Sequence, residues 1–246
     1  MTAGRRLTSL GLAALLALAA SLSASQTPVL TPIAGAGEQP APPWRVALLP
    51  KQKKAATRFA LVDIDGVRAL RVEAIASYGN LVHDLDAAAA GARTLAWRWR
   101  VDREVTGANL ASKSGDDTAL KVCALYDLPL QRVPFLERQL LRAARAISAE
   151  PLPAATVCYV WDSAQTAGSM LPSPFTKRLR YLVLQGQGVP LGQWRAEQRD
   201  LNADFLRAFG DETQEVPPLI AVAVGADADN TASHSLGYVT ALELRR

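Results

Sequence analysis

The chain has 246 residues, of which 49% are hydrophobic and 20% are charged, which is the composition of a globular protein and excludes a largely disordered one. Its 27 Lys and Arg face 23 Asp and Glu, and the N-terminal segment considered next carries two of the positive charges, which leaves 25 against 23. Such a balanced charge gives no reason to expect nucleic acid as a partner.

Residues 1–25 have the features of a secretory signal peptide. Arg5 and Arg6 precede an apolar run over 7–20, and small residues over 21–25 form a cleavage zone. The run is shorter than the roughly 20 residues that a membrane-spanning helix needs. We therefore expect cleavage near Ala24 or Ser25, no transmembrane segment afterwards, and a periplasmic or secreted protein.

The next segment, residues 26–43, is rich in Pro, Gly and Ala and has little periodicity. This composition predicts a flexible linker. A single folded domain is then expected over residues 44–246, beginning near Trp44.

The domain reads as a series of short strands. The run 58–64 and the run 67–76 flank Asp65-Gly66, which is the strongest short hairpin signal. The run 93–102 alternates, so that Leu95, Trp97 and Trp99 fall on one face. Five further strands are predicted over 118–127, 155–163, 178–186, 219–227 and 237–244. This pattern predicts a mainly β fold, an antiparallel β-sandwich of the jelly-roll or galactose-binding-like type, with two short helical insertions.

The two helical segments are 134–148 and 201–212, and the second is expected to end at Gly210. The first opens at Pro134 and has apolar residues at helical intervals, with arginines on another side. The apolar residues are Leu136, Leu140, Leu141, Ala144 and Ile147, and the arginines are Arg138, Arg142 and Arg145. We favour a helix that covers an open end of the sandwich; the alternative is docking to an acidic surface such as a layer of phospholipid headgroups.

Several stretches occur in a familiar order, among them "WRWRVD", "GDDTALKV", "YVWDS", "RLRYLVLQ" and "DADNTASHSLGYV". In this order the chain resembles the bacterial domain of unknown function family 3047, over roughly Trp44 to Leu244. Cys158 departs from the pattern because a polar residue is expected before "YVW", and the 127–156 connection is an elaboration. The resemblance implies a secreted β-sandwich and brings no catalytic residues with it.

The two cysteines, Cys123 and Cys158, lie in predicted strands. In an oxidising compartment they could form a disulfide, provided that the strands are neighbours. Two buried, inert thiols are the equally weighted alternative.

Acidic residues occur in two clusters. Asp227, Asp229 and Asn230 offer oxygen ligands that suit Ca²⁺, with Asp116 and Asp117 as a second acidic pair from another loop. Turn formation by Asp and Asn side chains is the slightly favoured alternative for 227–230.

Asp116 and Asp117 also raise the question of acid–base chemistry. Adjacent residues of a strand point to opposite faces, so the two cannot simply flank one scissile bond. A cross-strand ion pair of one of them with Arg98 or Arg100 is the favoured interpretation.

The five tryptophans bear on ligand binding, because an indole ring can stack on a sugar. Trp97 and Trp99 share the apolar face of one strand, so we expect them in the core. Trp44 and Trp194 are the better surface candidates, and Arg195 next to Trp194 could contact an anionic ligand.

These features predict an exported protein that binds a ligand without transforming it, a carbohydrate or envelope glycan above all, with a structural Ca²⁺ as an option. The ligand-binding candidates are Asp116, Asp117, Arg98, Arg100, Trp194 and Arg195. One alternative is an envelope hydrolase that uses carboxylates of the 116–117 and 227–229 loops. The other is a protein-interaction module of an envelope assembly.

Overall fold

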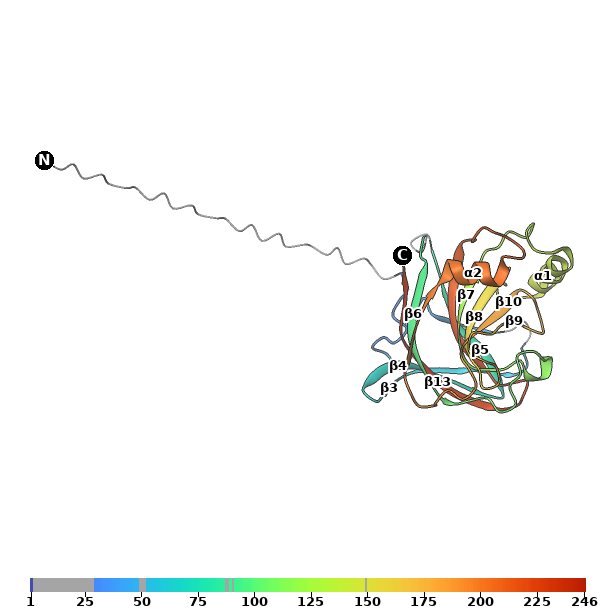
Figure 1. The fold of residues 1–246 in the computed structure, drawn as a ribbon. Helices are drawn as coiled ribbons and strands as arrows, with labels where there is room; N and C mark the ends of the chain where they lie inside the picture. Colours follow the sequence, from blue (N-terminus) through green and yellow to red (C-terminus); the bar gives the residue numbers. More distant parts are fainter. Residues whose placement is uncertain (2–28, 49–51, 87–88, 90, 149) are drawn as a thin grey trace.

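The structure is a computed structural model that describes residues 1, 29–48, 52–86, 89, 91–148 and 150–246. Residues 2–25 of the predicted signal peptide lie outside this part of the chain. Two β-sheets pack face to face (Figure 1), and the two helices lie at the margins of the sandwich. The predicted fold class, a mainly β sandwich with two short helices, is confirmed.

The larger sheet has eight strands in the order β1-β5-β12-β7-β8-β10-β9, and β2 pairs with β5. Its strands are β1 (Arg45–Ala47), β2 (Ala55–Ala56), β5 (Ser77–Asp84), β7 (Thr118–Tyr126), β8 (Ala155–Trp161), β9 (Met170–Pro172), β10 (Leu179–Gln185) and β12 (Leu219–Asp227). The pairs β8–β10 and β2–β5 are parallel and the others are antiparallel, so this sheet is mixed.

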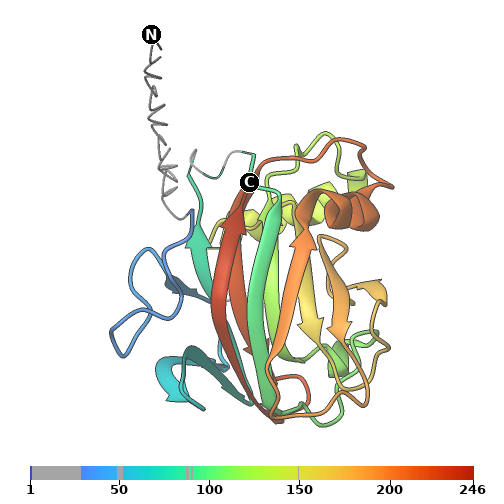
Figure 2. The same ribbon diagram turned by 60° about the vertical axis from the view of Figure 1, so that its left-hand side comes forward.

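The smaller sheet has five antiparallel strands in the order β11-β6-β13-β4-β3. They are β3 (Arg58–Ile64), β4 (Val67–Ile75), β6 (Thr94–Arg103), β11 (Arg195–Asp200) and β13 (His234–Arg245). The predicted hairpin is confirmed as β3–β4, with Asp65 (φ 50°) and Gly66 (φ 73°) both left-handed at its turn. Figure 2 shows the long strands of this sheet side by side.

Aromatic side chains join the two sheets. Trp97 and Trp99 of β6 are buried, with ring centres 5.3 Å from Tyr159 and 5.8 Å from Trp161 of β8, respectively. The expected place of Trp97 and Trp99 in the core is confirmed, and it follows from the alternation along β6.

Strand β5 was not predicted. It lies in the larger sheet, whereas β4, the strand that precedes it, lies in the smaller sheet. The chain passes from one sheet to the other at Ala76, which has a left-handed φ of 43° and donates its N–H to the carbonyl of Ser233. Gly79 and Asn80 are typical turn residues, yet both lie in β5.

Helix α2 (Leu201–Phe209) follows β11 directly and ends at Gly210, as expected. The carboxylate of Asp200 caps it by accepting from the N–H groups of Asn202 and Ala203. Phe205 packs on Tyr126 with ring centres 4.8 Å apart.

Helix α1 (Phe135–Ile147) has the predicted extent, but its apolar side does not cover the sandwich. Of its residues only Leu141 is buried, while Leu136, Leu140 and Ile147 are exposed. The expectation that this side packs on the domain is therefore corrected. No helix of the described residues is long and apolar enough to cross a membrane.

Residues 29–43 pack against the sandwich, which differs from the flexible linker expected over 26–43. Leu30 and Ile33 are only 3% and 2% exposed and belong to the main core. The carbonyl of Glu38 accepts from the N–H of Leu61, and Trp44 Nε1 donates to the carbonyl of Thr31 at 2.8 Å. Buried apolar side chains and hydrogen bonds thus hold this Pro/Gly-rich segment on the core.

Candidate functional site

The "GDDT" and "DADNT" stretches meet at one end of the larger sheet. β7 begins at Thr118 and β12 ends at Asp227, and in this antiparallel pair the two residues are opposite each other. The loops next to these ends, 115–117 and 228–231, are therefore brought together. We call residues 116–121 and 227–231 the junction.

Asp117 locks the two loops of the junction together. Its Oδ1 accepts from the backbone N–H and the Nδ2 of Asn230, at 3.2 and 3.1 Å. Its Oδ2 accepts from the backbone N–H and the hydroxyl of Thr231, both at 2.7 Å. Both oxygens of this fully buried carboxylate therefore accept hydrogen bonds from donors of the chain itself.

Asp227 holds a buried ammonium group. Its Oδ1 accepts from the backbone N–H of Thr118 at 2.8 Å, and its Oδ2 accepts from Lys121 Nζ at 2.8 Å. Lys121 is almost completely buried. Burial acts to lower the pKa of Lys121, but the Asp227 carboxylate outweighs this effect and raises the pKa above its ordinary value.

These contacts bear on calcium, for which Asp227, Asp229 and Asn230 were the candidate ligands. The ammonium of Lys121 lies where a cation on Asp227 Oδ2 would have to lie, and Asn230 uses its Nδ2 as a donor to Asp117. In the described part of the chain, no group of three or more His, Cys, Asp or Glu could hold a metal ion. Calcium at Asp227 Oδ2 would have to compete with Lys121, and calcium at the junction stays a prediction.

Two other carboxyl groups of the junction hold protons more tightly than usual. Burial raises the pKa of Asp116, and hydrogen bonds from Ser173 and Tyr181 offset this only in part. Burial also raises the pKa of Asp229, and the carboxylates of Asp117 and Asp227 raise it further. Asp116 is 5% exposed, so a substrate could not reach it without a rearrangement of its surroundings.

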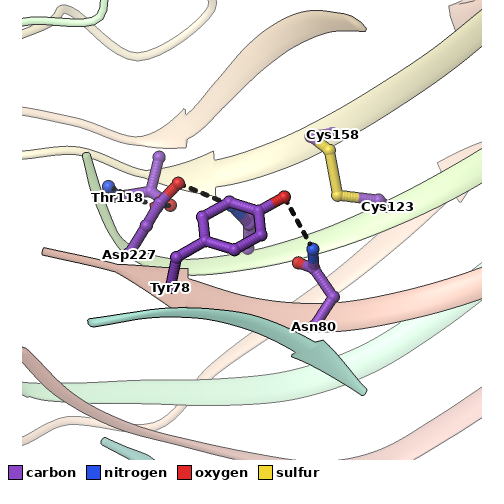
Figure 3. Close-up of a disulfide and its surroundings, with 7 residues drawn as sticks. Tyr78, Asn80, Thr118, Cys123, Cys158 and Asp227 are labelled. Atoms are coloured by element: carbon purple, nitrogen blue, oxygen red, sulfur yellow. Dashed lines mark hydrogen bonds and ion pairs between the residues drawn. A yellow bond between two sulfur atoms is a disulfide. The ribbon is translucent and has the colours of Figure 1, made fainter. Parts of the chain in front are cut away.

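Tyr78 and Asn80 of β5 complete the cluster on the outer face of the larger sheet (Figure 3). The ring centre of Tyr78 lies 5.1 Å from Lys121 Nζ, and the Tyr78 hydroxyl accepts from Asn80 Nδ2 at 3.0 Å. Opposite Asn80 in β12 is Gly225, where a Cβ atom would collide with Asn80 Oδ1 and would lie 2.8 Å from the carbonyl oxygen of Gly79. Only glycine leaves room for this side chain.

Cys123 and Cys158 form a disulfide on the same face, beside Tyr78 and Asn80 in Figure 3. They are directly opposite each other in the pair β7–β8, and their sulfur atoms are 2.00 Å apart. Of the two alternatives for these cysteines, the structure has the disulfide.

A second polar surface lies on the outer face of the smaller sheet. Arg98 of β6 is exposed, and its guanidinium carbon lies 5.4 Å from the ring centre of Trp194. No carboxylate of the described residues forms an ion pair with Arg98. Arg100 lies next to it but is paired with Asp102 at 2.6 Å. We call Arg98, Arg100 and Trp194 the Trp194 patch.

Trp194 differs from the other tryptophans because its side chain is only half-buried. Trp44, Trp97, Trp99 and Trp161 are all buried. Trp44, the second surface candidate, packs its ring on His83 with ring centres 4.9 Å apart. At the Trp194 patch, an indole ring therefore lies next to a cation that has no ion-pair partner within the described part of the chain.

Comparison with known protein families gives a match over almost the whole domain. Residues 42–243 match the family "Protein of unknown function (DUF3047)", which is the predicted resemblance. The chain belongs to the DUF3047 family. Among proteins with curated descriptions, none matches this DUF3047 chain.

Two solved structures resemble the DUF3047 domain. One is the xyloglucanase domain of NopAA, a type three effector from Sinorhizobium fredii, in complex with cellobiose; it has 9% identity and a TM-score of 0.41, over 82% of this chain and 97% of that one. The other is endoglucanase 3 of family GH12 from Trichoderma harzianum, with 9% identity and a TM-score of 0.38, over 84% of this chain and 100% of that one. At this level of similarity neither carries an argument about function.

The predicted ligand-binding residues of the DUF3047 chain fall into separate places. Asp116 and Asp117 lie at the junction, whereas Arg98, Arg100 and Trp194 lie on the outer face of the other sheet. Neither aspartate pairs with Arg98 or Arg100, so that expectation is corrected. Arg195 is opposite the core residue Trp99 in register and therefore lies on the inner side of β11, away from Arg98.

The sequence interpretation missed Lys121 of the junction and two tyrosines that contact the junction, Tyr78 and Tyr181. One signal was available, because Lys121 is the single charged residue inside the apolar run 118–126. A lysine in a strand that is otherwise buried needs a carboxylate partner.

Proposed function

We propose that this protein is exported and binds an anionic carbohydrate, such as an acidic envelope glycan, at the Trp194 patch. The observation that carries the proposal is the half-buried Trp194 ring beside Arg98, an exposed guanidinium that no carboxylate of the described residues neutralises. The ring offers an apolar surface for a sugar and the guanidinium offers paired donors for a carboxylate or phosphate.

The neighbours of the patch support this use of the sheet. Tyr238 of β13 is opposite Arg100 in register, and Thr240 is opposite Arg98. Arg71, on the next strand, is opposite Tyr238. Aromatic, hydroxyl and guanidinium groups thus lie next to one another on this face of the sheet, and such groups suit the hydroxyl-rich faces of an oligosaccharide.

Export is supported by the N-terminal features and by the Cys123–Cys158 disulfide. Disulfides persist in oxidising compartments and are rare in a reducing cytosol.

The contacts favour binding over the alternative of hydrolysis. Asp117 and Asp227 use their carboxylate oxygens to hold the chain together, and Asp116 is nearly inaccessible. Asp229 is the one carboxyl group of the junction that combines a raised pKa with partial exposure, and a glycosidase needs two.

The proposal is tested by calorimetric titration with a uronic-acid oligosaccharide and with the neutral oligosaccharide of the same length. Trp194→Ala should weaken both by about tenfold or more, since stacking is lost. Arg98→Gln should weaken only the acidic sugar, by about tenfold.

Arg58→Gln is the matched control, because Arg58 is an exposed arginine of the same sheet, on the far strand β3. It should bind both sugars as the unmodified protein does. Absence of binding to either sugar, or equal losses in Arg58→Gln and Arg98→Gln, would overturn the proposal.

A further inference from the structure

Helix α1 turns its apolar side to the solvent. Leu136, Leu140 and Ile147 are 74%, 66% and 61% exposed, and Phe135 at the start of the helix is also exposed. Figure 1 shows α1 at the periphery of the molecule, beyond the larger sheet. An exposed apolar surface of this kind on a soluble domain commonly marks an interaction site.

The geometry of the helix separates a docking side from a free side. Glu137, Leu141 and Arg145 follow one another at intervals of four residues and hold α1 on the domain. Glu137 contacts Arg178 at 3.7 Å, Leu141 belongs to the main core, and Arg145 Nε donates to the carbonyl of Leu152 at 2.8 Å.

The apolar residues lie on a different side. Leu136, Leu140, Ala143 and Ile147 are spaced by four, three and four residues, so they form one stripe along the helix. At 3.6 residues per turn, this stripe is rotated by about 130° from the docking side. The domain therefore does not use the stripe, which runs over the whole length of α1. We call these four residues the α1 stripe.

The charges on the other sides of α1 are mainly positive, and at 3.6 residues per turn Arg142 lies about 130° and Arg138 about 170° from the α1 stripe. Arg138, Arg142 and Arg145 are the cations of the helix, and its single acid, Glu137, faces the buried Arg178. Arg142 is exposed, and neither Arg142 nor Arg138 has an ion-pair partner among the described residues. Arg138 instead lies over the ring of Phe135, at 5.7 Å from its centre.

We propose that α1 binds the surface of an anionic lipid bilayer, with its axis parallel to the membrane plane. The α1 stripe would enter the boundary between headgroups and acyl chains, and the long side chain of the exposed Arg142 would extend to anionic headgroups. A helix with a continuous apolar stripe on one side and arginines on its polar side has the pattern of an interfacial helix. This surface is separate from the Trp194 patch, so it does not depend on the glycan proposal.

The test is sedimentation of residues 26–246, which contain every strand and helix of the structure, with lipid vesicles. The protein should bind vesicles of equimolar phosphatidylcholine and phosphatidylglycerol, and bind those of phosphatidylcholine alone much less. The variant Leu136→Ser/Leu140→Ser/Ile147→Ser should bind the anionic vesicles more than about tenfold more weakly. Arg142→Gln should bind them about fivefold more weakly and leave a weaker dependence on salt.

Two matched controls separate this effect from a general loss of apolar or positive surface. Leu191→Ser removes an exposed leucine outside α1, and Arg58→Gln removes an exposed arginine of the smaller sheet. Both should bind as the unmodified protein does, and circular dichroism should show that all variants fold. Binding that the triple variant retains would overturn the proposal. So would a protein that ignores the vesicles and forms a dimer that the triple variant cannot form, because the stripe would then serve a second copy of the chain.

Discussion

Asp117 and Asp227 show how much a single carboxylate can do in the structure of a loop. Each accepts at least three hydrogen bonds from donors that are more than a hundred residues away in the sequence. Such contacts fix two chain segments in one geometry, and each buried donor would otherwise lack a partner. The acidic character of "DADNT" is therefore explained by the junction itself.

Asp116 gives the junction a dependence on pH. Its raised pKa in the folded state, compared with about 3.9 in an unfolded chain, means that the folded protein binds this proton more tightly. At pH values above the pKa of the folded state, ionised Asp116 therefore lowers the free energy of unfolding. This loss disappears as the pH falls through the pKa of the folded state towards the pKa of the unfolded state. Asp116→Asn, which keeps an acceptor for Ser173, should raise the melting temperature at about pH 7 and have a shrinking effect towards about pH 4.

Differential scanning calorimetry of the two proteins across this pH range measures the effect. Asp127→Asn is the control, because Asp127 is an exposed aspartate. An advantage of Asp116→Asn that stays constant over the range would contradict the prediction, since it could not come from titration of Asp116.

At the scale of elements, the disulfide links β7 and β8, two neighbours that already share a ladder of hydrogen bonds. Its effect should therefore come mainly from the unfolded chain, where it closes a loop of 35 residues. Loop-closure entropy predicts that Cys123→Ser/Cys158→Ser lowers the free energy of unfolding by about 3–4 kcal/mol.

Chemical denaturation with and without a reductant tests this expectation. The reductant should destabilise the unmodified protein to the level of the double variant, and it should leave the variant itself unchanged. Equal stability of the oxidised protein and the variant would show that the unfolded chain gains nothing from the link.

The elements also show where sequence patterns suffice. The β3–β4 hairpin was predictable because Asp65-Gly66 specifies its own turn, and strand β12 was predictable because its first eight residues, "LIAVAVGA", are all apolar. Strand β5 was missed because Gly79 and Asn80 are typical of turns. The contacts that require them, Gly79 against Thr57 and Asn80 across Gly225, come from other parts of the chain.

The candidate site was less predictable than the fold. Alternation placed Arg98 on the outside of β6, and the acidic stretches stood out in the sequence. Which loops meet, however, depends on the pairing of β7 with β12, and no local pattern specifies that pairing. For α1 the helical spacing gave the right extent and the wrong face, because spacing alone does not say whether the domain or another surface covers an apolar stripe.

For the whole molecule, the question is where the fold begins. Large aromatic side chains fill the core between the two sheets. Leu30 and Ile33 extend this core into a segment with no regular secondary structure. Burial of these two side chains contributes as much as burial of a Leu and an Ile in the strands, because the hydrophobic effect depends on the area removed from water and not on secondary structure.

We therefore expect Leu30→Ala and Ile33→Ala each to lower the free energy of unfolding by about 2–5 kcal/mol. Denaturation followed by tryptophan fluorescence reports on this directly, since Trp97, Trp99 and Trp161 are in the same core. Gln39→Ala, an exposed change in the same segment, should stay within about 0.5 kcal/mol of the unmodified protein. If the segment were a true linker, none of the three substitutions would change the free energy of unfolding. If it belongs to the core, Leu30→Ala and Ile33→Ala lower that free energy, and the domain then starts before Leu30.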